Sequence, residues 1–282
     1  MLYAGRNPSP PLDAFIERIW SCSDSGAPLR ERERALPGGG TVDLIVNLVE
    51  DEVRVYDPDR PERVERTRSG AVVTGARTRS ILFEPRQRAS AVGVHFKPGG
   101  AFAFLGISPW EIVDASIQVG DLWGRFGRSL HEQLLEASTA HERFDLLEAA
   151  LLERLRHAPR RVHPAARLGV RALAHAAGTA RVSAVAASLG LSRRRFVEVF
   201  EREVGVTPKL FARLRRFHRV KQHVAARGQP ASWGAFALEC GYFDQSHMIR
   251  DFVEFSGMTP TGYVQSSSSE TVLDHLVHSY AA

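Results

Sequence analysis

The amino-acid sequence predicts an α+β protein. A small β-rich N-terminal domain with appended helices is expected first, followed by an all-α C-terminal domain in which a long helix joins two helix-turn-helix units. Short alternating apolar runs between about residues 35 and 96 are separated by Gly, Pro and Asp, which is typical of β-strands. Further along the chain, apolar residues recur at helical spacing, and a set of them repeats after 52 positions.

Chain length and composition limit the classes of protein to which this sequence can belong. A chain of 282 residues is longer than a common single domain, so two domains with separate cores are expected. No apolar run approaches the roughly 18 residues of a membrane span, and Met1–Pro8 does not resemble a secretory signal. We therefore expect a cytoplasmic protein without membrane contact. Its two cysteines, Cys22 and Cys240, are expected to be reduced and buried.

The first domain is expected at residues 1–121. Its strand patterns are Thr41–Leu48, Val53–Tyr56, Ala71–Val73 and Ala91–Phe96. The turn Pro98–Gly100 then leads into an apolar helix over Ala101–Leu105. A further short helix begins at Ser108, because Ser is a good N-cap and the Pro that follows suits the first helical position.

The segments between and after the domains follow from apolar periodicity and composition. Residues 122–157 are expected to form two amphipathic helices that bridge the domains, with apolar positions at Leu130, Leu134, Leu135, Phe144, Leu147, Leu151, Leu152 and Leu155. Residues 158–164 are the expected linker, and residues 165–265 the helical domain. Residues 266–282, which begin with four serines, are expected to form a flexible tail.

The helical domain contains an internal duplication. It becomes visible when Ser192 is aligned with Asp244, an offset of 52 residues. The pairs that follow are Phe196 with Met248, Phe200 with Phe252, Gly205 with Gly257, Thr207-Pro208 with Thr259-Pro260, and Phe211 with Tyr263. With the register shifted by one residue upstream, Val182, Val185, Ala186, Leu189 and Gly190 match Trp233, Phe236, Ala237, Cys240 and Gly241.

Each repeated residue has a structural role. Ser192 and Asp244 are good N-caps, and the apolar residues four and eight positions later share one helix face. The glycine thirteen positions after each cap supplies a left-handed C′ residue, and Thr-Pro begins the next helix. A short helix with a small residue, a glycine turn and a capped helix form a helix-turn-helix, so the chain is predicted to contain two.

The predicted connector between the two units is one helix over Pro208–Ala226, ended by Gly228. Its 19 positions span about 28 Å at 1.5 Å per residue. This length is close to the roughly 34 Å between successive major-groove faces of B-DNA. The two units are therefore expected to reach one face of one duplex.

Charge is unevenly divided along the chain. Residues 1–160 hold 21 Lys and Arg against 23 Asp and Glu, whereas residues 161–265 hold 16 against 7. The basic surplus therefore lies in the C-terminal third. Concentrated positive charge favours phosphate binding, although it also suits a merely soluble surface.

The second repeat carries a recognisable motif. The segment Gly241–Phe252, GYFDQSHMIRDF, followed by Gly257–Tyr263, GMTPTGY, resembles the second helix-turn-helix signature of AraC/XylS regulators. The resemblance covers about residues 164–265 and implies a seven-helix domain that acts on promoter DNA. Residues Gly93–Ala101, together with Leu36–Gly40 and Asp43–Ile45, resemble the N-terminal domain of one subgroup, which supplies no known ligand to carry over.

Nine residues on the two capped helices are the candidates for contact with DNA: Arg193, Arg194, Arg195, Val197, Glu198, Gln245, Ser246, His247 and Arg250. Arginine pairs bidentately with guanine, but at a helix N-terminus it reaches phosphate equally well, so both interpretations stay open for the three arginines. Glu198 departs from the family pattern: it either accepts from cytosine N4 or pairs with Arg194 or Arg202 on its own helix.

The resemblance assigns roles on the second capped helix. It implies base or phosphate contacts for Gln245, Ser246 and Arg250, whereas His247 either joins them or supports the turn. Thr259 is expected to be a helix cap. In this family, helices such as those at residues 122–157 often carry a dimer contact, but packing against the strands of the first domain is the other interpretation.

The N-terminal domain shows no clear chemical site. No run resembles a phosphate-binding loop or a zinc site, and no cofactor is expected. A packed or surface histidine is the preferred interpretation of His95, and a solvated lysine that of Lys97. The aromatic residues Trp20, Phe83, Phe96, Trp110 and Trp123 line an apolar pocket in one interpretation and fill the core in the other.

The expected function is therefore a sequence-specific transcription regulator that is not an enzyme. Its expected partners are double-stranded promoter DNA, RNA polymerase, an unidentified small-molecule effector and a second copy of the chain. One alternative is a constitutive regulator without an effector. A remote alternative is an enzyme fused to a DNA-binding module, as in DNA-repair methyltransferases. Those enzymes use an N-terminal cysteine cluster, whereas Cys22 is the only cysteine here before Cys240.

Overall fold

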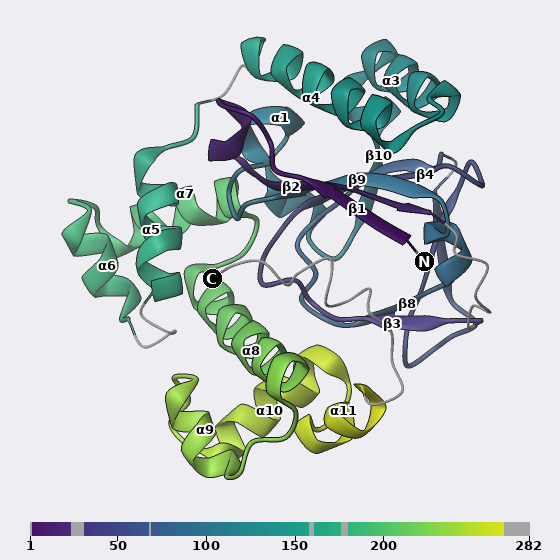
Figure 1. The fold of residues 1–282 in the computed structure, drawn as a ribbon. Coiled ribbons are helices and arrows are strands. Elements are labelled where there is room, and N and C mark those ends of the chain that lie inside the picture. Colours follow the sequence, from purple (N-terminus) through teal and green to yellow (C-terminus); the bar gives the residue numbers. More distant parts are fainter. Residues whose placement is uncertain (1, 24–30, 68, 158–160, 176–179, 268–282) are drawn as a thin grey trace.

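The computed structural model describes residues 2–23, 31–67, 69–157, 161–175 and 180–267 (Figure 1). The strands in these residues are β1 (Leu2–Arg6), β2 (Ile16–Ser23), β3 (Glu33–Ala35), β4 (Asp43–Asn47), β5 (Val53–Tyr56), β6 (Val64–Thr67), β7 (Ala71–Thr74), β8 (Ile81–Phe83), β9 (Ala91–Phe96) and β10 (Ser116–Gln118). The 3-10 helices are η1 (Leu12–Ala14), η2 (Pro85–Arg88) and η3 (Pro109–Ile112).

The α-helices divide between the two domains. The N-terminal region holds α1 (Phe102–Leu105), α2 (Val119–Trp123), α3 (Arg125–Glu136) and α4 (Ala140–Arg156). The described part of the C-terminal domain holds α5 (Pro164–His175), α6 (Val182–Ser188), α7 (Arg193–Val204), α8 (Pro208–Arg227), α9 (Trp233–Glu239), α10 (Gln245–Ser256) and α11 (Pro260–Ser267). Seven helices is the number that the resemblance implies. The predicted α+β fold class is confirmed.

Two antiparallel sheets form the N-terminal domain. The six-stranded sheet has the order β1-β2-β9-β4-β7-β10, and the four-stranded sheet has the order β3-β8-β5-β6. Strand β9 lies between β2 and β4, and all six of its residues are buried. The four predicted strands are present. Six strands were missed. Three of them, β3, β8 and β10, have only three residues each, too few to show a period of two, and the burial of the longer β2 does not alternate.

Helices α3 and α4 cover the six-stranded sheet (Figure 1). Leu134, Leu147 and Leu151 are fully buried in the same core as Leu44 of β4. Of the apolar positions predicted on these helices, Leu135 stays exposed, with 47% of its surface accessible. The structure thus places both helices on the N-terminal domain. Their apolar faces are used within the chain, as the second interpretation of these helices expected.

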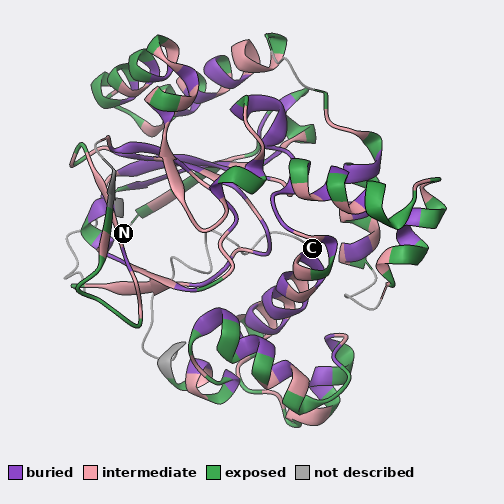
Figure 2. Ribbon diagram, turned by 180° about the vertical axis from the view of Figure 1, so that it is seen from behind, coloured by how far each residue is buried: buried purple, intermediate pink, exposed green. Residues whose placement is uncertain are grey.

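Each helix-turn-helix unit of the C-terminal domain has its own core. One core includes Phe196, Phe200 and Phe211, and the other includes Phe217 and Phe252. Helix α8 supplies residues to both, which makes it the rigid connector that its apolar spacing predicts; buried residues follow its whole length in Figure 2. It extends one residue beyond the predicted end.

The ends of the C-terminal segments differ slightly from expectation. Helix α11 runs to Ser267, two residues beyond the predicted end of the domain, because helical hydrogen bonding continues into the serine run. The rest of the expected tail, residues 268–282, lies outside the described residues, as do residues 158–160 of the expected linker. Helix α5 already begins at Pro164, the last residue assigned to that linker.

The N-terminal domain contacts the C-terminal ends of both α7 and α10. At α7, Ser108 Oγ donates a hydrogen bond to the Arg202 carbonyl oxygen at 2.7 Å. At α10, Arg34 Nη1 and Ser80 Oγ both donate to the Ser256 carbonyl oxygen, at 3.3 and 3.2 Å. The last carbonyls of a helix lack partners within the helix, so these bonds satisfy groups that the helix leaves open.

Candidate nucleic-acid interface

The first capped helix, α7, begins as the sequence predicts. Ser192 Oγ accepts a hydrogen bond from the Arg195 amide at 3.2 Å, and Gly205 ends the helix with φ 93°. Phe196, Val199 and Phe200 are fully buried. The first turn carries Arg193, Arg194 and Arg195, all exposed. Three cations therefore gather around amide groups that are themselves suited to anions.

Glu198 is occupied by its own helix. Arg194 Nε donates to Glu198 Oε1 at 2.9 Å, and Arg195 Nη1 lies 3.5 Å from Oε2. The hydrogen bond from Arg194 lowers the pKa of Glu198 below its ordinary value. Arg194 is thus one of the two partners that the sequence offered, and the other, Arg202, bonds Glu203 at 2.5 Å instead. Val197 is half-buried at the edge of this surface.

The second capped helix, α10, exposes less charge. Asp244 Oδ1 accepts from the His247 amide at 2.6 Å, which confirms the predicted cap. Gln245, Ser246 and Arg250 are exposed on the outer face. The His247 ring packs edge-on against Tyr242, with ring centres 5.3 Å apart. The structure thus gives His247 the supporting contact that one interpretation expected.

Helix α10 is held on α8 by a partly buried ionic cluster. Asp251, 3% exposed, accepts hydrogen bonds from Arg213 Nε and Nη2 at 3.1 and 2.8 Å. Arg213 also donates to Glu254 at 2.5 Å, and these carboxylates raise its pKa. Below them, the rings of Phe217 and Phe252 lie 4.9 Å apart. The inner face of α10 is therefore fixed, and its outer face is left to solvent.

Helix α7 is anchored by different chemistry. Glu203, fully buried near its C-terminal end, accepts a hydrogen bond from the His163 amide at 2.7 Å and one from Arg202. The rings of Phe200 and Phe211 lie 5.5 Å apart and join α7 to α8. The glutamate thus ties the helix to the segment that enters the domain.

Phe243 is an interface candidate that the sequence reasoning missed. It directly precedes the cap of α10, where an apolar residue usually packs against the helix as a hydrophobic staple. Here 85% of its surface is exposed, beside the exposed Gln245. Its position directly before an N-cap places it beside the first turn of α10, but the sequence does not show whether the ring turns inward or outward.

The contacts of the candidate residues in the N-terminal domain decide between the interpretations that the sequence left open. His95 is buried, with Nδ1 2.5 Å from Asp43 Oδ1. Lys97 Nζ donates to the Asp13 carbonyl at 2.7 Å. Of the predicted aromatic residues, Trp20, Phe83, Phe96 and Trp123 are buried, whereas Trp110 is 49% exposed. Both cysteines are buried free thiols, as predicted.

Among the described residues, no three His, Cys, Asp or Glu side chains gather in a way that could hold a metal ion. Within the same part of the chain, no helix is long and apolar enough to cross a membrane.

Comparison with known proteins agrees with this geometry. A family model described as a helix-turn-helix domain matches residues 185–266, from within α6 to the last turn of α11. A second family model, described as a domain of unknown function, DUF6597, matches residues 6–118. The first match falls on the two capped helices and their connector. The second covers most of the strands.

The similar proteins either match only a short part of this chain or share little sequence identity with it. The probable transcriptional regulator LumQ of Photobacterium leiognathi is 33% identical over 73 residues, which span 26% of this chain and only 29% of that protein. Crystal structures of ToxT from Vibrio cholerae resemble the chain distantly. An apo variant has a TM-score of 0.44 at 10% identity, covering 94% of this chain and 97% of that one. ToxT from strain O395 has a TM-score of 0.43 at 8% identity, covering 93% and 97%.

The family assignment rests on the C-terminal domain. Two units with matched caps, αL glycines and Thr-Pro starts flank one long helix, and the helix-turn-helix family model covers this region. The C-terminal domain is therefore a helix-turn-helix domain of the AraC type.

Proposed function

We propose that this protein regulates transcription by reading promoter DNA with both helix-turn-helix units. The observation that carries the proposal is an arrangement that α7 and α10 share. Each has a capped N-terminal half with exposed polar side chains, while its C-terminal end is held by the N-terminal domain. A helix that enters the major groove presents its N-terminal residues to the base edges, which matches this arrangement.

The connector supports readout of adjacent grooves. Helix α8 has 20 residues, about 30 Å at 1.5 Å per residue. Successive major-groove faces are roughly 34 Å apart. Two units on the ends of such a helix would meet one face of one duplex, one helical turn apart.

The residues divide by chemistry. Arg193, Arg194 and Arg195 on α7 would hold phosphates or guanine, and the pairing of Glu198 with two of them limits their reach. Gln245, Ser246 and Arg250 on α10 suit adenine and guanine edges. Val197 would add an apolar contact and His247 would support the turn.

The test is selection from a randomised duplex pool at near-physiological salt, with sequencing of the bound fraction. Two short enriched blocks about one helical turn apart are the expected result. Binding that merely follows salt concentration, with no enriched sequence, would contradict readout of bases.

The N-terminal domain is proposed to sense an effector or to mediate dimerisation, and RNA polymerase is the further partner proposed for the complex on promoter DNA. Because Leu135 is the exposed apolar position of α3, a dimer through these helices would be centred there. Analytical ultracentrifugation of Leu135→Glu and of the unchanged chain compares their oligomeric states and tests this.

A constitutive regulator without an effector is the alternative to an effector sensor. A metabolite screen separates the two, because a ligand at a hundred times its Kd raises the free energy of unfolding by about 2.7 kcal/mol.

A further inference from the structure

The turn of the second helix-turn-helix unit is one residue longer than the turn of the first. Its glycine, Gly241, matches Gly190 at an offset of 51 residues, whereas the N-caps Asp244 and Ser192 match at an offset of 52. Both glycines have a positive φ, 83° and 68°, so the two turns begin in the same way. The second unit therefore has one additional residue between the glycine and the cap.

Backbone hydrogen bonds identify the additional residue as Phe243. In the first unit the amide of Leu191, the residue after the glycine, donates to the Ala186 carbonyl oxygen at 3.0 Å. The amide of Tyr242 makes the matching bond to the Ala237 carbonyl oxygen at 2.9 Å. Tyr242 thus takes the place of Leu191, and Phe243 is the residue that has no counterpart in the first unit.

Tyr242 already supplies the apolar contact that the start of α10 needs. A residue just before an N-cap often packs against the fourth residue of the helix and fixes how the chain enters it. In the first unit Leu191 packs against the core that holds Phe196, the fourth residue of α7. In the second unit Tyr242, 3% exposed, shares a core with Met248, the fourth residue of α10. The second unit therefore does not use the ring of Phe243 to fold.

The ring of Phe243 is left in solvent. Its exposed fraction of 85% is the largest among the large apolar side chains of the described residues. A partner that covered the ring would gain free energy from the apolar surface removed from water. Single exposed apolar residues are nevertheless common on proteins, so the position of the ring must indicate the partner.

That position is the end of α10 that would enter the major groove. Phe243 directly precedes the cap, and the exposed Gln245 and Ser246 follow in the first turn. The other end of α10, at Ser256, is the one that the N-terminal domain holds through hydrogen bonds. Because the N-terminal residues of a recognition helix face the base edges, the ring continues the surface that is proposed to read DNA.

The chemistry of this surface favours a base over a phosphate as the partner of the ring. The first turn of α10 carries no Lys or Arg, in contrast to the three arginines in the first turn of α7. A phenyl ring has no donor for a phosphate oxygen. The distinctive apolar group in the major groove is the C5-methyl group of thymine, and phenylalanine is one of the side chains that contact it.

We propose that Phe243 is a specificity-determining residue, whose ring packs against the C5-methyl group of one thymine at the edge of the block that α10 reads. This inference rests on the proposed reading of promoter DNA by both units. The additional residue gives the second unit a preference for thymine that the first unit, which has no counterpart of Phe243, does not have.

The test is a double-mutant cycle between protein and DNA, measured by fluorescence anisotropy on the duplex selected by the unchanged chain. Each thymine of the enriched blocks is replaced in turn by deoxyuridine, which pairs with adenine in the same way and lacks only the C5-methyl group. The protein variants are Phe243→Ser and Phe243→Leu. The control is Val49→Ser, which removes an apolar side chain that is 59% exposed in the N-terminal domain. Circular dichroism checks the folding of each variant, and analytical ultracentrifugation checks its oligomeric state.

At one thymine, deoxyuridine should weaken binding of the unchanged chain about threefold to fivefold, the factor expected from one buried methyl group. Phe243→Ser should bind the thymine duplex about threefold to tenfold more weakly, and it should no longer distinguish thymine from deoxyuridine at that position. Phe243→Leu should retain part of both effects, because it keeps an apolar side chain. Val49→Ser should behave like the unchanged chain at every position.

The inference is overturned if Phe243→Ser binds the selected duplex like the unchanged chain, or if it keeps the full response to deoxyuridine at every thymine. Unchanged DNA affinity with an altered oligomeric state would assign the ring to a second copy of the chain instead. The proposed function fails in a different way: no sequence would be enriched from the pool, and this inference would fall with it. Enrichment without coupling between Phe243 and any thymine overturns this inference alone.

Discussion

At the scale of single residues, the outer faces of α7 and α10 carry different chemistry. The first turn of α7 holds three exposed arginines, whereas α10 offers an amide, a hydroxyl and Arg250. Arginine contributes to affinity through phosphates on any sequence, while amide and hydroxyl groups gain most from the edges of particular bases. We therefore expect α7 to contribute more to affinity and α10 more to selectivity.

Arg250→Ala tests this division. If Arg250 reads a base, specific binding should weaken by about 1 to 3 kcal/mol, and the preference for the selected site over a scrambled duplex should fall. Fluorescence anisotropy on both duplexes measures it, with Arg227→Ala as the control on α8. Equal weakening on both duplexes would make Arg250 a phosphate contact instead.

Glu198→Gln should strengthen DNA binding. The substitution removes a negative charge from the surface and releases Arg194 and Arg195 from their pairs at 2.9 and 3.5 Å. An exposed pair is weak, so the gain should be about twofold to fivefold at physiological salt. The same anisotropy assay compares the DNA affinity of this variant with that of the unchanged chain, with exposed Glu132→Gln on α3 as the control. Weaker binding would indicate that Glu198 accepts a hydrogen bond from cytosine.

Cys240 should be an inert thiol. It is 1% exposed, and burial raises its pKa from 9.0 to about 11. The folded state therefore keeps its proton where the unfolded state loses it, so this stabilisation is complete below pH 9 and is lost as pH rises toward about 11. Ellman's reagent should label neither cysteine of the native protein at pH 8 and both in urea. Rapid native labelling would show that the thiol is reached by solvent.

At the scale of elements, α7 and α10 each depend on an N-cap and on the ionic contacts that hold the helix in place. The cap orients the first turn, and the ionic contacts differ between the two units. Helix α10 is held by Arg213 and Asp251, whereas α7 is held through buried Glu203. The repeat is therefore symmetric in backbone and asymmetric in its ionic contacts.

Asp244→Ala should destabilise the second unit. It removes the acceptor of the His247 amide, a bond of 2.6 Å, and the expected loss is about 0.5 to 2 kcal/mol of unfolding free energy. Urea unfolding followed by circular dichroism measures the loss. Asp244→Ser keeps a capping oxygen and should recover most of it. A serine variant as unstable as the alanine variant would show that the aspartate acts by another route.

At the scale of the whole molecule, the N-terminal domain meets both repeats at equivalent glycines. A Cβ on Gly205 would lie 3.0 Å from Pro109, and one on Gly257 would lie 3.1 Å from Arg34 Nη1. The two glycines are matched by the offset of 52 and have φ values of 93° and 75°. One domain thus holds the spacing of the two units at both of its ends.

Combined Arg34→Ala and Ser80→Ala substitution should loosen the second contact. It removes two hydrogen bonds to the Ser256 carbonyl, worth about 1 kcal/mol each. Hydrogen exchange should accelerate at the C-terminal end of α10 and stay unchanged in β9. Exposed Arg63→Ala serves as the control. Unchanged exchange in α10 would mean that its end is held without the N-terminal domain.

Local signals in the sequence determined most of the C-terminal domain. Ser192, Gly205, Thr207, Asp244 and Gly257 begin or end helices through bonds to their near neighbours, so their spacing alone predicts α7, α8 and α10. The two-sheet order of the N-terminal domain was not predictable in the same way. Short strands such as β3 and β8 exist only because partners distant in the sequence complete their hydrogen bonds.

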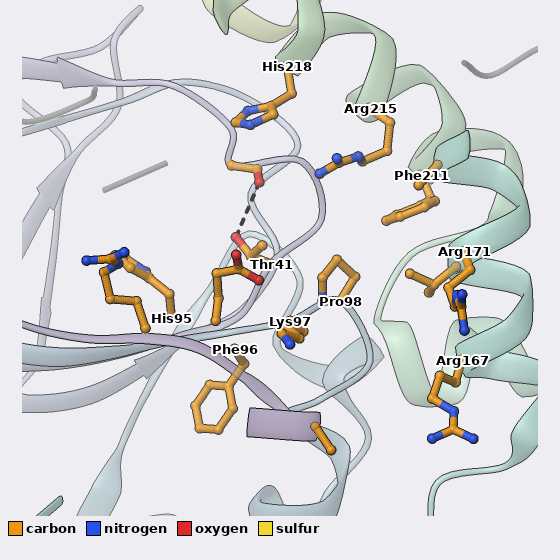
Figure 3. Close-up of a pocket in the computed structure, with 16 residues that line it drawn as sticks. Thr41, His95, Phe96, Lys97, Pro98, Arg167, Arg171, Phe211, Arg215 and His218 are labelled. Carbon is orange, nitrogen blue, oxygen red and sulfur yellow. Dashed lines mark hydrogen bonds between the residues drawn. The ribbon is translucent and has the colours of Figure 1, made fainter. Parts of the chain in front are cut away.

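The tertiary structure alone decided which groups meet across the domains. Arg34 and Ser80 reach the carbonyl of Ser256, and Lys97 and Arg215 line one cavity between the domains (Figure 3). Residues more than a hundred positions apart share no local pattern, because their proximity depends on how whole elements pack. The sequence by itself therefore determined that the chain has two helix-turn-helix units, and the packing of the two domains decided what lies between them.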